Sequence, residues 1–160
     1  MQTHFLFDVL EGYQPFEQIA EESRRDGAVI AASGLSGAQK AHLACALAAR
    51  TGRPLVFLCD SERSAAQTME DVSALMGGGV SLFPAREITF YQDVAASRDV
   101  AYRRIEAMRK LVSGEVRAIV APADAMLHRV MPRAVFSANT ISLRVGDVLP
   151  TDQLIERLLA

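Results

Sequence analysis

Short apolar runs alternate along the chain with longer segments in which apolar residues recur at helical spacing. Four of these runs are nearly uninterrupted by polar residues, as is typical of strands that are covered on both faces. The alternation of such runs with helical segments predicts βαβ units and a mostly parallel sheet. The four candidate strands are residues 28–32, 55–59, 80–83 and 118–121.

Three helices are expected between these runs, because each segment carries residues that begin or end helices. Asp60 or Ser61 caps the start of the second helix, and Ser97 caps the third. Glycine follows the second helix at Gly77 and the third at Gly114. We predict helices over residues 37–50, 61–76 and 97–112, with two short amphipathic helices before the first run.

The pattern changes after residue 121, which indicates a second domain. A short helix over 123–130, a strand over 141–145 and a helix from about residue 151 are predicted there. That last helix is still amphipathic at the final residue, so we expect this domain to be truncated. The predicted fold is therefore an α/β, P-loop-like, doubly wound lobe over 1–134, with helices on both faces, and the start of a small α/β domain over 135–160.

Composition narrows the possible functions. Apolar residues make up 50% of the chain, which excludes disorder, and the net charge of −2 provides no positive field to attract nucleic acid. No apolar run approaches the roughly 18 residues of a membrane span, and no signal peptide is recognisable, so a cytoplasmic protein is expected. Cys45 and Cys59 are expected to be buried free thiols, and no metal site is predicted.

The motif with chemical meaning is GLSGAQKA, which follows the first apolar run. Gly34 and Lys40 match the first glycine and the lysine of the phosphate-binding pattern GxxxxGK[ST], with Gly37 between them. Gln39 replaces the second glycine, whose absent side chain leaves room for phosphate oxygens. Ala41 replaces the hydroxyl residue that binds magnesium. The loop is therefore expected to be inactive in nucleotide binding, with no catalytic residue and no cofactor.

Two further groups of charged residues have structural explanations. Asp60 closes an apolar run as a catalytic acid would, but a second acid does not follow it, and we interpret it as a helix cap. Glu106 lies four residues before Lys110, which predicts a solvated, ion-paired helix face rather than a phosphate-binding stripe. The basic residues of that face are Arg103, Arg104, Arg109 and Lys110.

Four segments resemble the N-terminal region of the bacterial transcription-repair coupling factors, a family similar to the excision-repair helicase subunit UvrB. The segments are GLSGAQKA, FPAREITFYQDVAASRDVAYRRIEAMRKL from Phe83, AIVAPADAMLHRVMP from Ala118 and LRVGDVLPTDQLIERLL from Leu143. The second segment is specific to the family because its residues recur at spacings with no general structural meaning. These motif residues are Phe83, Pro84, Glu87, Tyr91, Ser97, Asp99 and Arg103.

The resemblance implies a helicase-like lobe without ATPase activity that acts in transcription-coupled nucleotide excision repair. It also implies that UvrA is recruited through the domain that begins near Val135. Other partners are domains of the same longer protein, and distant domains would contact RNA polymerase and DNA and use ATP and magnesium. UvrB carries a DNA-gripping β-hairpin after its tyrosine-rich segment, but here Tyr91 lies only six residues before Ser97, so DNA clamping is not expected.

Two other functions remain open at the level of sequence. The chain could be an active P-loop NTPase with an unusual loop, or a doubly wound domain that binds another anion at the start of the helix at Gly37. Nucleotide or anion binding to the purified chain distinguishes both from a non-catalytic module.

Overall fold

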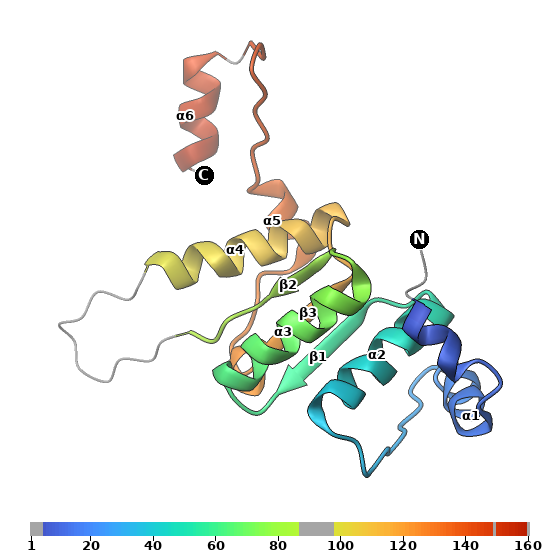
Figure 1. Cartoon of the computed structure of the whole chain (residues 1–160). Helices are drawn as coiled ribbons and strands as arrows, with labels where there is room; N and C mark the ends of the chain where they lie inside the picture. The colour runs from blue at the N-terminus through green and yellow to red at the C-terminus, as the bar shows by residue number, and fades with distance from the viewer. Residues whose placement is uncertain (1–4, 87–97, 149, 160) are drawn as a thin grey trace, which may run out of the picture. The chain divides into compact units, whose positions relative to one another are not determined.

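A three-stranded parallel sheet lies at the centre of the first of two units (Figure 1). The computed structural model describes residues 5–86, 98–148 and 150–159, and it divides after His128. The strands are β1 (Leu55–Cys59), β2 (Val80–Leu82) and β3 (Ala118–Pro122), in the order β1-β3-β2. The central strand β3 is buried along its whole length, as its uninterrupted apolar sequence predicts.

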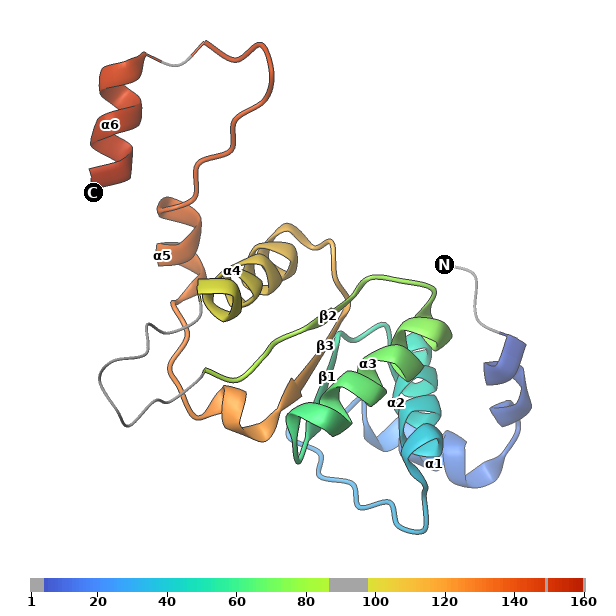
Figure 2. The same ribbon diagram turned by 60° about the vertical axis from the view of Figure 1, so that its left-hand side comes forward.

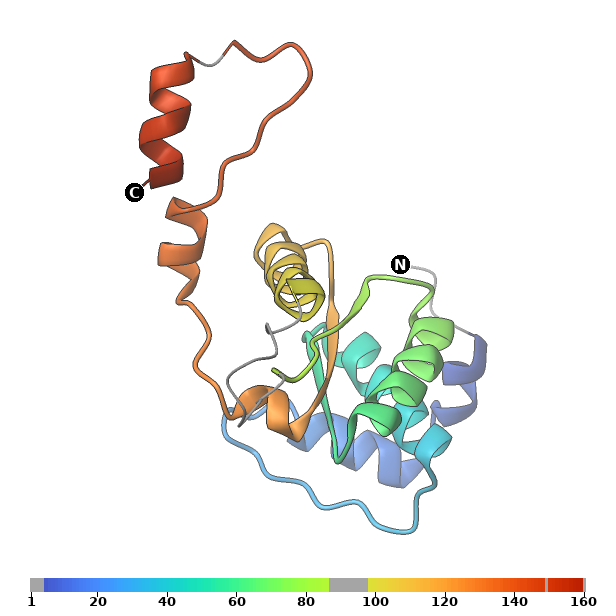
Figure 3. The ribbon, with the colours of Figure 1, turned by 90° about the vertical axis from the view of Figure 1, so that its left-hand side faces the viewer.

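Helices cover both faces of this sheet, which confirms the α/β prediction. The helices α2 (Gly37–Thr51) and α3 (Glu62–Met76) lie on one side, and α4 (Arg98–Ser113) lies on the other (Figures 2 and 3). The bounds follow the caps: α3 begins after Ser61 and ends at Gly77, whose φ of +67° suits glycine. The predicted cap Ser97 lies outside the described residues.

The core consists of one hydrophobic cluster on each side of the sheet. On the α2 and α3 side, Cys45, Val72 and Val120 are buried together, and Cys59 belongs to the same cluster. Both cysteines are free and buried, as predicted. The cluster on the α4 side is smaller and contains Phe83, Ala107, Val116, Ile119, Ala121 and Ala125.

The two short N-terminal helices that were predicted are present, and both pack against α2. They are the 3-10 helix η1 (Phe5–Leu10) and α1 (Gln14–Glu22), and each buries one phenylalanine, Phe7 and Phe16 respectively. Polar contacts fasten α1 to the end of α2, where Arg50 pairs with Glu17 at 3.2 Å. Arg53 donates to the carbonyl oxygens of Ser23 and Arg24 at 3.0 and 3.1 Å.

The strand predicted over residues 28–32 is wrong. This segment forms no strand, and Val29 is 95% exposed. Apolar and β-branched residues favour a strand only where a neighbouring strand and a packing surface are available. In the structure this segment pairs with no strand and is mostly exposed, so the sheet has three strands among the described residues and β1 lies at its edge.

The described residues of the second unit form two helices, α5 (Arg133–Ala138) and α6 (Thr151–Leu159). The final helix was predicted, but the strand predicted over 141–145 is wrong, because no strand pairs with this segment among the described residues. A turn follows, in which the backbone N–H of Asp147 donates to the carbonyl oxygen of Arg144 at 3.0 Å. The domain boundary expected after residue 134 falls inside α5. This short helix was not among the elements expected from the sequence.

The last helix of the first unit is shorter than expected. The helix predicted over 123–130 is the 3-10 helix η2 (Ala123–Met126). Within the described ranges, no helix is long and apolar enough to cross a membrane.

Candidate functional site

The predicted phosphate-loop residues come together at the start of α2. Gly34 has a φ of +79°, which favours glycine, and Gly37 is the first residue of the helix. The Lys40 side chain is exposed and makes no ion pair within the described part of the chain. The junction therefore has the loop and the lysine of the motif, but it lacks the preceding strand.

The Gln39 side chain caps the N-terminus of α2. Its Oε1 accepts a hydrogen bond of 2.8 Å from the backbone N–H of Ser36, the N-cap residue. The first backbone N–H groups of a helix have no partner within the helix, and phosphate-binding loops use them to bind anions. Here the chain's own Gln39 side chain takes up one of them, the Ser36 N–H.

Ala41 faces away from the loop. Its exposed fraction is 0%, and it belongs to the hydrophobic cluster that contains Cys45 and Val72. A hydroxyl at this position would lie in that cluster rather than beside a bound phosphate. The position of the magnesium ligand in the motif thus lacks an oxygen and also points toward the core.

Asp60 belongs to the cap of α3, as the sequence analysis proposed, although Ser61 is the N-cap residue itself. The Asp60 carboxylate accepts hydrogen bonds from the hydroxyl groups of Ser61 and Ser64. These bonds lower the pKa of Asp60, with that of Ser64 contributing most. In the described ranges no three His, Cys, Asp or Glu residues are grouped so that they could hold a metal ion.

An apolar cavity of about 430 Å³ adjoins the loop, between α1 and α2. Tyr13, Phe16 and Leu43 contribute to its walls, and Gln39 lies at its polar side. The Gln39 amide is already engaged by Ser36, as described above. The lining of the cavity is mainly apolar and contains neither lysine nor arginine to bind a phosphate.

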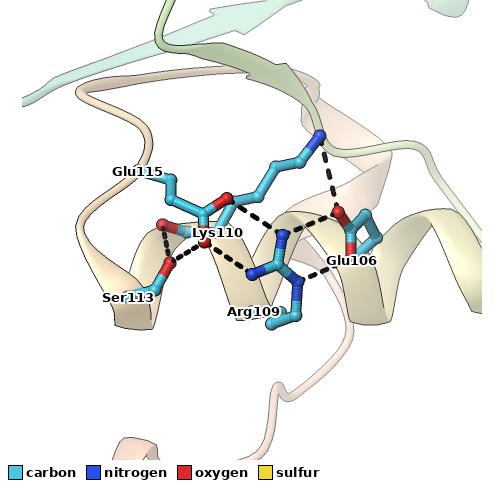
Figure 4. Close-up of polar contacts among 5 residues, drawn as sticks. All are labelled: Glu106, Arg109, Lys110, Ser113 and Glu115. Atoms are coloured by element: carbon cyan, nitrogen blue, oxygen red, sulfur yellow. Dashed lines mark hydrogen bonds and ion pairs between the residues drawn. The ribbon is translucent and has the colours of Figure 1, made fainter. Parts of the chain in front are cut away.

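Three of the four basic residues assigned above to one face of α4 are ion-paired at the surface, as predicted. Arg103 pairs with Asp99, and Lys110 lies 3.6 Å from Glu106. Arg109 bridges Glu106 and Glu115, with contacts of 2.8 and 2.6 Å (Figure 4). Hydrogen bonds from Arg109 are the main reason why the pKa of Glu106 falls to about 2.

Arg104 does not belong to this solvated face, which corrects the prediction. It is only 4% exposed, its guanidinium lies 4.0 Å from the centre of the Phe83 ring, and its Nη1 donates to the Pro84 carbonyl oxygen at 2.6 Å. Burial lowers its pKa. Sequence reasoning missed this role, although Arg104 lies three residues before the buried Ala107 and so shares its helix face.

The structure brings together only part of the family motif. Phe83 and Pro84 meet α4 through Arg104, whereas Asp99 and Arg103 pair with each other on the exposed side. Glu87, Tyr91 and Ser97 lie outside the described residues. The motif residues therefore do not form one site among the residues described.

Comparison with known proteins finds two similar proteins. No family model matches the chain. The chain is 27% identical over 128 residues to the transcription-repair-coupling factor of Bacillus subtilis, and the match covers 79% of this chain. It is 30% identical over 156 residues to that of Myxococcus xanthus, and this match covers 92% of the chain.

The chain is related to the transcription-repair-coupling factors. This confirms the resemblance that the four sequence segments indicated. The matches cover only 11% and 13% of the two coupling factors, so the chain corresponds to a small part of each.

Proposed function

We propose that this chain is a non-catalytic module of a transcription-repair-coupling factor, acting in transcription-coupled nucleotide excision repair. The observation that carries the proposal is the closed start of α2, where Gln39 takes up the Ser36 N–H and Ala41 points into the core. An ATPase needs open N–H groups and a magnesium ligand at this place. The relation to the coupling factors supports the repair context.

In this proposal different parts of the longer protein carry out recruitment, scaffolding and ATP-dependent steps. The second unit forms the start of the surface that recruits UvrA, and the first unit is the scaffold that carries it. Exposed apolar side chains of the second unit, such as Val145 and Val148, support an interaction role for that unit. Contacts with RNA polymerase and DNA, and the use of ATP and magnesium, lie in other parts of the longer protein.

Repair activity tests the non-catalytic role. We expect Lys40→Ala in a complete coupling factor that contains this region to leave transcription-coupled repair unchanged, because in this proposal the loop binds no nucleotide and Lys40 is an exposed side chain. Repair is measured as the excess removal of lesions from the transcribed strand. Ala41→Asp serves as the control that shows sensitivity, since it places a charge in the core. Loss of repair in Lys40→Ala with normal folding would contradict the proposal.

Capture of UvrA tests the recruiting role. Val145 in the second unit and Val29 in the first unit are both almost fully exposed valines, so replacing either by aspartate changes a surface without opening the core. We expect Val145→Asp to weaken co-elution of UvrA with the chain and Val29→Asp to leave it unchanged. Equal effects of the two variants, or no co-elution with the unaltered chain, would count against recruitment through the second unit.

An anion-binding function is the second candidate, and the exposed side chain of Lys40 beside the start of α2 favours it. It differs from the first proposal in that an anion would bind beside the Ser36 N–H, which Gln39 occupies in the structure. Titration of the purified chain with ATP and magnesium in a calorimeter tests whether a nucleotide binds there, as this second candidate allows and the first does not.

A further inference from the structure

Among the described residues, no strand pairs with the outer edge of β2. In the order β1-β3-β2, this strand bonds to β3 on one side only. The Gly79 carbonyl oxygen and the Phe83 N–H both pair toward β3, at 2.8 Å each. Because alternate residues of a strand point their backbone groups to opposite sides, those of Val80 and Leu82 point outward. These outward groups have no backbone partner within the described residues.

A groove lies beside this edge, under one flank of α4. It has a volume of about 390 Å³ and is lined by Ser81 and Leu82 of β2 and by four residues of α4. The side of α4 that packs on the sheet carries Arg104 and Ala107, so the lining residues lie on the neighbouring flank. Those four residues are Tyr102, Arg103, Glu106 and Lys110.

This geometry leaves a covered position for one more strand. A strand paired with β2 would lie roughly 4.8 Å beyond it, under the flank of α4 that already overhangs the edge. Peptides that extend a sheet commonly bind between an edge strand and a helix, with main-chain bonds for affinity and side-chain contacts for selectivity. The groove between β2 and α4 has both components.

The charges in the groove favour an acidic occupant. Glu106 receives hydrogen bonds of 2.8 and 2.9 Å from Arg109, which satisfy most of its carboxylate. Lys110 reaches the same carboxylate only at 3.6 Å, so its ammonium group keeps donors for another partner (Figure 4). Arg103 is already paired with Asp99. Lys110 is therefore the cation of the groove that is most available to a carboxylate.

We infer that the groove between β2 and α4 binds an extended acidic peptide segment of a partner protein. The segment adds a fourth strand along β2, hydrogen-bonded to the backbone of Val80 and Leu82, and places a carboxylate beside Lys110.

A model peptide tests this inference on the complete 160-residue chain. The probe is a blocked octapeptide of alternating valine and glutamate, followed by amide NMR. We expect the Val80 and Leu82 amides to shift and to exchange more slowly with solvent when the peptide is added. Shifts centred on the β1 edge, or no shift at millimolar peptide, would overturn the inference.

Two variants test the charge contact. Lys40 and Lys110 are the two lysines of the chain, and both are surface positions, so Lys40→Glu is a matched control for Lys110→Glu. We expect Lys110→Glu to weaken peptide binding about fivefold and Lys40→Glu to leave it unchanged. A peptide with lysine in place of glutamate should bind Lys110→Glu better than the unaltered chain, which excludes simple misfolding as the cause.

A modified peptide tests the backbone contact. Methylation of the peptide nitrogens that face β2 removes hydrogen-bond donors and blocks close approach, while methylation of the alternate nitrogens leaves the paired edge intact. We expect the first peptide to bind at least about tenfold more weakly than the second. Equal binding of the two peptides, or equal binding to both lysine variants, would contradict strand addition at β2.

Discussion

The starts of α2 and α3 resemble each other in detail and differ in what precedes them. At each, a serine is the N-cap and the side chain three residues later accepts a hydrogen bond from that serine's N–H. Gln39 does so for Ser36 at 2.8 Å, and Ser64 does so for Ser61 at 3.2 Å. The apolar run before α3 is the paired strand β1, whereas the run before α2 is exposed and unpaired.

The comparison shows that the motif-like junction is an ordinary capped helix start. A phosphate-binding loop is held between a strand of the sheet and a helix, with its N–H groups free. The α3 junction has the strand but no phosphate-loop sequence, and the α2 junction has part of the sequence but no strand. At both ends a side chain of the first turn accepts a hydrogen bond from the N-cap N–H, which an anion-binding helix start would keep free.

The largest expected effect concerns Ala41, where restoring the hydroxyl of the motif should damage the fold. Ala41→Thr adds atoms and a polar group at a fully buried position, so we expect a loss of about 1–3 kcal/mol in the free energy of unfolding. Urea denaturation measures this loss.

Ala38→Thr is the matched control, since Ala38 is exposed on the same helix. It should cost only the difference in helix propensity, about 0.5 kcal/mol. Equal losses for the two variants would mean that position 41 does not face the core.

A second prediction compares the two apolar runs directly. Val56 in β1 and Val29 in the unpaired run are 59% and 95% exposed. Val56→Asp should lower the free energy of unfolding by about 1 kcal/mol, because aspartate is unfavourable in a paired strand. Val29→Asp should change it by about 0.5 kcal/mol or less. A large loss from Val29→Asp in urea denaturation would show that residues 28–32 pair after all.

The cap of α2 provides a third, smaller effect. Gln39→Ala removes the acceptor of the Ser36 N–H, so we expect it to lower the free energy of unfolding by about 0.5–1 kcal/mol. The glutamine side chain does not titrate, so this loss should be the same at pH 7 and at pH 3. A loss that varied with pH would show that a charged group contributes to this cap.

The cap of α3 should depend on pH, which distinguishes the two junctions. The pKa of Asp60 lies below its ordinary value of 3.8, so its contribution to stability is present above that value and is lost as the pH falls through the lower, folded-state pKa. Asp60→Asn should therefore destabilise the chain slightly at pH 7, and this difference should disappear in strong acid. Thermal unfolding of both proteins across this pH range measures it, and a pH-independent difference would contradict the assignment.

Local signals explain which parts of the fold could be predicted. The bounds of α2 and α3 follow from caps and apolar spacing, which neighbouring residues determine. Strands over 28–32 and 141–145 are expected from their local apolar pattern, but a strand also needs to pair with another strand, and neither segment does so among the described residues.

The candidate site could be predicted only as far as local residue types determine it. The sequence showed that Gln39 and Ala41 break the motif, because the residue types are visible directly. It did not show that Gln39 caps Ser36 or that Ala41 is buried, since both depend on side-chain direction. Arg104 was misplaced because the pairing of its neighbours with acids suggested an exposed position, whereas tertiary packing against Phe83 buries it.

Nucleotide binding is the most direct test of the central claim, that the α2 junction is closed to phosphate. The purified chain is titrated with ATP and magnesium in a calorimeter, with Lys40→Ala as the comparison. We predict no binding tighter than about millimolar for either protein. Saturable binding by the unaltered chain at lower concentration, weakened by Lys40→Ala, would contradict the account.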